Sequence, residues 1–337
     1  MPDARPRIDY LATGGTIASV PGAAPGVAPT LTAAEIARSV DGIDRIADLR
    51  THQFLQGPSA AIGVSDLLRM RDELAERVAD GARGFVLTQG TDTIEETAFV
   101  LDLLWAGEAP IVVTGAMRNP SVPGTDGPAN ILAAVQVAAS EQARGLGVLV
   151  VLNDEIHAAR FVRKMHTSRP STFASPAVGP IGWVSEGRPV VAVRPLGRPR
   201  LAVPTGADVP PVALVRLGLG DDGRLLSALV ELGFRGAVIE AFGGGHVAPV
   251  MVPLLQRLAT EMPVVLASRT GSGEVLSETY RFTGSEIELL AMGLIRAGML
   301  DGLKARLLLT LCLAAGCSRA QIVEEFRVVG MRSAQTA

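Results

Sequence analysis

Short apolar runs alternate with segments of helical periodicity along the first half of the chain, and this alternation limits the possible folds more than any other feature. The runs have the length and composition of buried strands, whereas leucines recur at helical spacing between them. We expect strands at residues 8–12, 84–88, 110–114 and 147–152, and helices at residues 33–39, 66–79, 94–105 and 128–144. Strands separated by helices predict a parallel, doubly wound α/β sheet.

The domain organisation follows from a change of pattern in the second half. Two strand-like runs flank Glu186-Gly187, which is typical of a β-hairpin at the edge of a sheet. Residues 194–211 are rich in Pro, Gly and Arg, with little periodicity, and we interpret them as a linker. The prediction is a larger N-terminal α/β domain at residues 1–193, with a doubly wound, mainly parallel sheet, and a smaller C-terminal α/β domain at residues 212–337.

Charge excludes several classes of partner. The sequence has 31 Lys and Arg against 34 Asp and Glu, a net charge of −3. Such a balance supplies no basic field for nucleic acid, so we expect no nucleic-acid partner. A cluster of arginines lies in or beside the proline-rich stretch, and we expect these residues to be solvated: Arg188, Arg194, Arg198 and Arg200.

Features of secreted and membrane proteins are missing from the sequence. Residues 1–7 lack the apolar core of a signal peptide, and no apolar run reaches the ~18–20 residues of a membrane span. Cys312 and Cys317 have neither disulfide-framework nor metal-site spacing, so we expect thiols in a reducing compartment. We therefore expect a cytoplasmic protein with no membrane partner, no metal and no cofactor, although a chain without its leader would look the same.

Three predicted strands end in turns that combine glycine with a reactive or small residue. These turns are Gly14-Gly15-Thr16, Gly90-Thr91-Asp92 and Gly115-Ala116. Ligands of open α/β sheets bind beyond the carboxyl ends of the strands, and glycine lets backbone N–H groups approach a ligand or an oxyanion. A threonine hydroxyl is a weak nucleophile that needs a base or a nearby cation. Asp92, and Lys164 from a later loop, are suited to supply them.

Each of these features also has a purely structural interpretation. Asp92 and Thr93 are good helix caps in front of Ile94, and Lys164 stands near two arginines as a solvated charge would. Two other functional classes lack their motifs. There is no G-x-G-x-x-G or Gly-Lys-[Ser/Thr] loop for a nucleotide, and no G-x-S-x-G turn for a serine hydrolase.

The motifs taken together resemble those of the bacterial-type L-asparaginases. Residues 10–18 (YLATGGTIA) and 88–98 (TQGTDTIEETA) are similar to the two signature motifs of that family. Residues 113–118 (VTGAMR), 126–128 (DGP) and 148–154 (VLVVLND) match in order and spacing. The resemblance covers nearly the whole chain and implies an amidohydrolase that converts L-asparagine to L-aspartate and ammonia, without a cofactor, as a homodimer or homotetramer.

The resemblance also implies catalytic roles. Thr16 would attack the side-chain amide carbon and form an acyl-enzyme as ammonia leaves. Thr91, with Asp92 and Lys164, would position or activate the water that releases aspartate.

Substrate-binding roles are implied in the same way. Backbone N–H groups of the two threonine turns, at Gly15 and Gly90, would hold the oxyanion. The carbonyl of Ala116 would bind the leaving amide nitrogen, and Ser59 would bind the α-carboxylate. Asp92 would also pair with the α-ammonium group.

Several positions depart from the family pattern. The Gly- and Pro-rich segment at residues 20–30 is expected to be a mobile loop. Residues 17–30 lack the tyrosine usual in this loop, which leaves Tyr280 or a water to assist Thr16. Ala60 replaces a glutamine that contacts the substrate, and His246 replaces an asparagine of a glycine-rich turn. Activity on L-glutamine or on D- or N-substituted asparagine therefore stays open, as does binding without catalysis.

Overall fold

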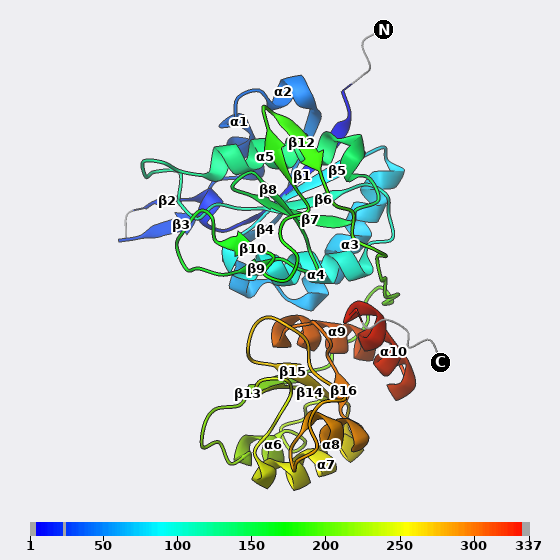
Figure 1. Ribbon diagram of the computed structural model, residues 1–337. Coiled ribbons are helices and arrows are strands. Elements are labelled where there is room, and N and C mark those ends of the chain that lie inside the picture. Colours follow the sequence, from blue (N-terminus) through cyan, green and yellow to red (C-terminus); the bar gives the residue numbers. More distant parts are fainter. Residues whose placement is uncertain (1–4, 23–24, 332–337) are drawn as a thin grey trace. The chain divides into compact units, whose positions relative to one another are not determined.

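Residues 5–22 and 25–331 are described in the computed structural model, and they form two compact units (Figure 1). The chain passes from the first unit to the second between Arg200 and Leu201, inside residues 194–211. The first unit contains a large mixed sheet and the second a smaller parallel sheet, each with helices. The α/β fold with a larger N-terminal and a smaller C-terminal part is therefore confirmed.

An eight-stranded sheet forms the core of the first unit, with strand order β12-β11-β8-β7-β6-β5-β1-β4. Neighbouring strands from β4 to β7 are parallel, and β8, β11 and β12 are antiparallel to their neighbours. The strands are β1 (Arg7–Gly14), β4 (Asp48–Gly57), β5 (Gly84–Thr88), β6 (Ile111–Thr114), β7 (Val148–Leu152), β8 (Glu155–Ala158), β11 (Gly182–Ser185) and β12 (Arg188–Val191). The expected hairpin around Glu186-Gly187 is the pair β11–β12 at one edge.

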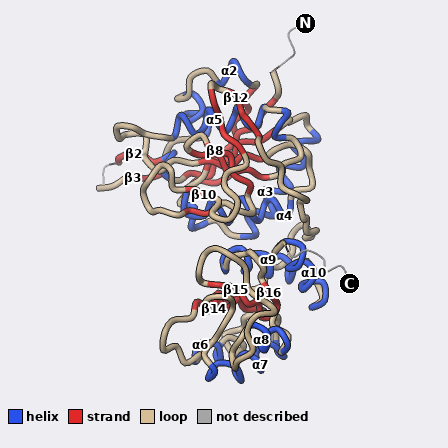
Figure 2. The backbone as a smooth tube through the Cα atoms, viewed as in Figure 1, coloured by secondary structure: helices blue, strands red, loops and turns tan. Residues whose placement is uncertain are grey.

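Helices cover both faces of this sheet, which explains why β5 and β7 are buried throughout instead of alternating between buried and exposed residues (Figures 1 and 2). On one face, Tyr10 and Val86 pack with Ile131 and Val135 of α5. On the other, Phe85 meets Trp105 edge to face, 5.9 Å between ring centroids. The helices are α1 (Ala33–Arg38), α2 (Ile43–Ile46), α3 (Val64–Ala79), α4 (Ile94–Leu104) and α5 (Gly127–Ala139).

Local capping sets where these helices begin. Thr32 and Glu35 form the expected capping box in front of α1, with Thr32 N–H donating to the Glu35 carboxylate at 2.8 Å. Helix α3 begins at Val64, earlier than predicted, because the Asp66 carboxylate accepts the Gly63 N–H at 2.9 Å.

Two segments differ from the expected secondary structure. Strand β4 escapes prediction because it is a half-buried edge strand of mixed polar composition. The Gly- and Pro-rich segment, expected as a loop, contains a small hairpin of β2 (Ser19–Pro21) and β3 (Val27–Pro29). Its base is tied down because the Ala18 carbonyl accepts the N–H groups of Thr30 and Leu31, both at 3.0 Å.

One arginine of the proline-rich stretch, Arg198, is not solvated as expected. Arg198 is only 13 % exposed, and its Nε lies 3.2 Å from Oδ1 of Asp102 on α4. It also donates to the carbonyl oxygens of Trp105 and Gly107. Arg198 therefore fastens the end of the first unit to its own helix layer, whereas Arg188 is exposed.

The second unit is built on a four-stranded parallel sheet in the order β13-β14-β15-β16. Helix α9 packs against β13, β14 and β15, and α7 against β15. The elements are β13 (Val212–Arg216), α6 (Arg224–Ala228), β14 (Gly236–Ala241), α7 (Val252–Glu261), β15 (Val264–Ser268), α8 (Glu286–Ala291), β16 (Ile295–Arg296), α9 (Gly302–Ala314) and α10 (Arg319–Val329). Among the described residues, no helix has the length and hydropathy needed to cross a membrane.

A buried hydroxyl pair between β1 and β5 provides a test of the core. Tyr10 is fully buried, its OH lies 2.9 Å from Oγ1 of Thr88, and burial raises the pKa of Tyr10. We expect Thr88→Val to lower the free energy of unfolding by about 1–3 kcal/mol, because it leaves the phenol buried without its partner. Urea denaturation measures this loss, and Tyr10→Phe in the same chain should restore most of it. An unchanged midpoint in Thr88→Val would contradict the pairing.

Candidate active site

Sheet register brings the predicted turns to one edge. Ala12 of β1 is the register partner of Thr88 of β5, which is in turn the partner of Thr114 of β6. Because these strands are parallel and end level with one another, the chain segments that follow them share the carboxyl edge of the sheet. Those segments carry the predicted site residues Gly15, Thr16, Gly90, Thr91, Asp92 and Ala116.

Two glycines place the two threonine turns in direct backbone contact. Gly15 has φ +84°, and a Cβ added there would lie 2.1 Å from the backbone N of Gly90. A Cβ on Gly90 would in turn lie 3.0 Å from Oγ of Ser59. The Gly15 N–H is anchored to the Gly57 carbonyl at 3.1 Å. The turns after β1, β4 and β5 therefore meet at a point where a side chain on Gly15 does not fit.

Lys164 completes a polar triad with the second threonine turn. Its Nζ donates to Oγ1 of Thr91 at 2.9 Å and to Oδ1 of Asp92 at 2.6 Å. Lys164 lies on β9 (Arg163–Lys164), which pairs with β10 (Phe173–Ala174). Thr91 is buried and the Lys164 side chain is 14 % exposed, whereas that of Asp92 is 77 % exposed. Lys164 is thus neither solvated nor unpaired, and Asp92 is the member open to a ligand.

Ser59 lies beside this triad with an unused hydroxyl. Its Oγ is buried and has no hydrogen-bond partner within the described part of the chain, so it is free to bind a ligand. The Ser59 carbonyl accepts the Thr93 hydroxyl at 3.1 Å, and Thr93 Oγ1 accepts Nε2 of Gln89 at 3.2 Å. Ala60 is exposed and adds no polar group.

The Gln89–Thr93–Ser59 chain corrects the helix-cap interpretation of the second motif. Thr93 precedes α4 but makes no side-chain cap hydrogen bond, because its hydroxyl is directed to Ser59. Sequence reasoning did not assign this positioning role to Gln89 or Thr93. The one sequence feature that could have indicated this role is the length of the second motif, which contains both residues.

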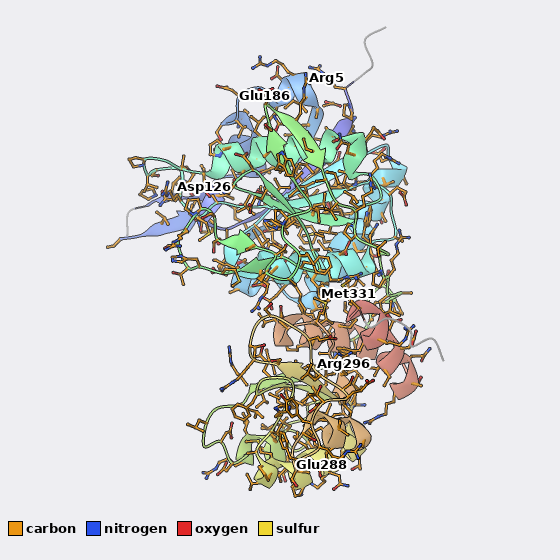
Figure 3. The ribbon with its side chains drawn as sticks, in the orientation of Figure 1. Arg5, Asp126, Glu186, Glu288, Arg296 and Met331 are labelled. Atoms are coloured by element: carbon orange, nitrogen blue, oxygen red, sulfur yellow. The ribbon has the colours of Figure 1, made fainter. Side chains whose placement is uncertain are left out.

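The turn at Ala116 is held by polar side chains of the Asp-Gly-Pro segment. The Asp126 carboxylate, labelled in Figure 3, accepts the N–H groups of Met117 at 3.0 Å and Arg118 at 2.8 Å. Asn130 Nδ2 donates to the carbonyl that precedes Ala116 at 2.9 Å. Ala116 itself is buried, and the groups on either side of it are held by Asp126 and Asn130.

Thr16 opens a short 3-10 turn, Thr16–Ala18, and is half-buried. The Ser19 hydroxyl donates to the Gly15 carbonyl at 2.8 Å and so closes the turn. Tyr10 cannot assist Thr16, because its hydroxyl is buried against Thr88.

In the second unit, His246 contacts neighbouring side chains and is not an isolated loop histidine. Its Nε2 lies 3.1 Å from Oε2 of the buried Glu286, and its ring centroid lies 4.9 Å from that of Tyr280. Burial acts to raise the pKa of Glu286, but backbone N–H groups of Tyr280 and Thr279 outweigh it, and the pKa is lowered.

Known protein families match both units of the chain. Residues 7–196 match the asparaginase N-terminal model, and residues 211–326 match the glutaminase/asparaginase C-terminal domain. The chain belongs to the asparaginase family.

Individual relatives agree with this assignment. A probable L-asparaginase of Deinococcus radiodurans is 36 % identical, over 97 % of this chain and 98 % of the relative. A glutaminase-asparaginase of Pseudomonas fluorescens is also 36 % identical, over 78 % of this chain and 75 % of the relative. The crystal structure of a probable cytoplasmic L-asparaginase from Campylobacter jejuni is similar with a TM-score of 0.86 at 30 % identity, covering 96 % of this chain and 99 % of that one.

The contact between the threonine turns of this asparaginase can be tested with a single methyl group. We expect Gly15→Ala to lower the free energy of unfolding by about 2–4 kcal/mol, since overpacking against backbone adds to the cost of positive φ. Gly179→Ala is the matched control, because Gly179 has φ +77° and nothing within 4 Å of an added Cβ. There we expect a loss of only about 1 kcal/mol. Equal urea midpoints for the two variants would contradict the close contact.

Proposed function

We propose that the chain is an L-asparaginase that hydrolyses the side-chain amide of L-asparagine to L-aspartate and ammonia. The observation that carries this proposal is the Lys164–Thr91–Asp92 triad, which lies against the Thr16 turn through the Gly15–Gly90 contact. Membership of the asparaginase family supports the same reaction. The substrate is a small amino acid, and the proposed roles need no metal or cofactor.

In the first half-reaction, Oγ of Thr16 attacks the amide carbon. Backbone N–H groups at the Gly15 and Gly90 turns stabilise the oxyanion, a contribution that is typically worth about 2.7–4 kcal/mol for each donor. The carbonyl of Ala116 holds the amide nitrogen. Collapse of the tetrahedral intermediate breaks the carbon–nitrogen bond, and the proton lost by Thr16 leaves on ammonia. An aspartyl ester on Thr16 remains.

In the second half-reaction, water cleaves this ester. Thr91, hydrogen-bonded to the Lys164 amine, orients or activates the water. The water oxygen joins the acyl carbon as the bond from that carbon to Oγ of Thr16 breaks. One proton of the water returns to Oγ, and the other leaves the new carboxyl group, as it ionises, to ammonia or solvent. Lys164 is well placed for this role because its amine is held by Asp92 and largely withdrawn from solvent.

The α-substituents of the substrate are bound at the exposed side of the triad. We propose that Ser59 Oγ binds the α-carboxylate and that the Asp92 carboxylate pairs with the α-ammonium group. Ala60 contributes no hydrogen bond there, and one charge-assisted hydrogen bond is worth about 1.5–3 kcal/mol. Affinity for asparagine is therefore modest, and substrates modified at the α-amino group are tolerated better than in relatives that carry glutamine at this position.

Glutamine is the second candidate substrate. It is longer than asparagine by one methylene, a difference that binding pockets discriminate by only about 1–3 kcal/mol. The glutaminase-asparaginase among the relatives favours this alternative. We further propose a cytoplasmic homodimer or homotetramer. Support for the compartment comes from the free thiols of Cys312 and Cys317 and from the cytoplasmic asparaginase among the similar structures.

Ammonia release from a substrate panel tests the reaction. The panel contains L-asparagine, D-asparagine, L-glutamine and an N-acylated asparagine. We expect the highest kcat/KM with L-asparagine and detectable turnover of at least one other member. Release of no ammonia from any of the four would overturn the proposed function, and a preference for L-glutamine would replace it with the alternative.

Variants of the two threonines should stop the reaction at different steps, which distinguishes their roles. We expect Thr16→Ala and Thr91→Val each to lower kcat at least about 100-fold, the usual minimum for loss of an acid–base or nucleophilic group. Mass spectrometry of quenched reactions should show an aspartyl adduct in Thr91→Val and none in Thr16→Ala.

Thr260→Ala is the control for these variants, because Thr260 is exposed on α7. It should retain the normal rate. A near-normal rate in Thr16→Ala, with unchanged folding, would move the nucleophile to Thr91.

A further inference from the structure

A cavity of about 250 Å³ opens in the first unit away from the threonine turns. It is lined by Asp102 near the end of α4, Leu146 ahead of β7, and Phe161 and Arg160 beyond β8. Because β8 runs antiparallel to β7, these residues lie at the amino edge of the parallel strands, whereas the active-site turns lie at the carboxyl edge. The cavity is therefore separate from the proposed active site.

Arg160 is the residue that makes this cavity unusual. Its side chain is half-buried, and burial lowers the pKa of its guanidinium. Its nearest aromatic contact is the ring of the adjacent Phe161, 5.9 Å from the guanidinium carbon. Across residues 5–22 and 25–331 it makes no hydrogen bond or ion pair. The negative charge of Asp102 partly offsets the effect of burial on Arg160. A guanidinium that loses water without gaining a hydrogen-bonded partner is nevertheless costly, so an anion in the cavity would be stabilising.

A second guanidinium, that of Arg198, lines the same cavity. It is already engaged, with Nε 3.2 Å from Oδ1 of Asp102, and Asp102 also accepts the Val148 N–H at 3.0 Å. Burial raises the pKa of Asp102, and the positive charges of Arg198 and Arg160 oppose that shift. With two guanidiniums and one carboxylate in its lining, the cavity keeps a net positive charge.

The size and shape of the site indicate a small ligand. Water occupies about 30 Å³ per molecule in the liquid, so the cavity has room for several waters or for one small ion with part of its hydration. Guanidinium groups bind planar or tetrahedral oxyanions through paired N–H donors. We propose that the cavity binds a small oxyanion, a carboxylate or a phosphate, held by Arg160 and oriented by Arg198.

Titration of the intact protein with two probes tests this site. Inorganic phosphate and malonate are each added at constant ionic strength, with NaCl as the balancing salt because surface charge effects depend on ionic strength. Thermal unfolding and calorimetry report binding to the wild type, to Arg160→Gln and to Arg188→Gln. The last variant is the matched control, since it removes the same charge from an exposed position on β12.

We expect a saturable rise of the melting temperature in the wild type and in Arg188→Gln, with dissociation constants that agree within about twofold. Arg160→Gln should weaken binding by about tenfold or more, as loss of a charge-assisted hydrogen bond does. Response to phosphate alone, or to malonate alone, decides which oxyanion the site takes. Arg160→Lys keeps the positive charge but lacks the paired N–H donors of a guanidinium. It replaces Arg160→Gln in the experiment if that variant fails to fold.

Two results would overturn the proposal. One is the absence of saturable binding of either probe to the wild type. The other is equal binding to the wild type and to the folded Arg160 variant, which would place the anion elsewhere.

Discussion

The architecture of the active site depends on one close approach between two backbones. Gly15 follows β1 and Gly90 follows β5, far apart in the sequence. A Cβ added to Gly15 would nevertheless lie 2.1 Å from the backbone N of Gly90. The contact needs parallel neighbouring strands that end level with one another and a residue that tolerates positive φ. Its consequence is that the hydroxyl proposed to attack and the hydroxyl proposed to direct water are carried by touching turns.

The polar side chains around this contact are of two kinds: some are hydrogen-bonded to one another, and others are available to a ligand. Hydrogen bonds join Lys164 to Thr91, and Gln89 through Thr93 to the carbonyl of Ser59. These bonds hold the turn after β5 against the Ser59 turn after β4. Asp92 and the Ser59 hydroxyl retain unused capacity, one exposed and one buried. Preorganised groups of this kind favour recognition of an α-amino acid, because they need little reordering when the ligand arrives.

Most of the first sheet could be predicted, and the errors have identifiable causes. The largely buried strands β1, β5, β6 and β7 stood out because both faces of the sheet are covered. Strand β4 did not, since a half-buried edge strand has no continuous apolar run. Arg198 looked like a linker charge because its partner Asp102 lies far away in the sequence. Thr93 looked like a cap because its preferred partner, Ser59, belongs to another turn.

The sequence alone determined the alternation of strands and helices, the glycine-led turns and the family to which they belong, since periodicity and motifs are local properties of the chain. Only the tertiary structure decided which groups meet. The approach of Lys164 to Thr91, the Thr93–Ser59 bond and the cavity that Arg160 shares with Arg198 each depend on residues from different elements. Such relations arise from sheet register and helix packing, which bring distant segments together and which no local pattern encodes.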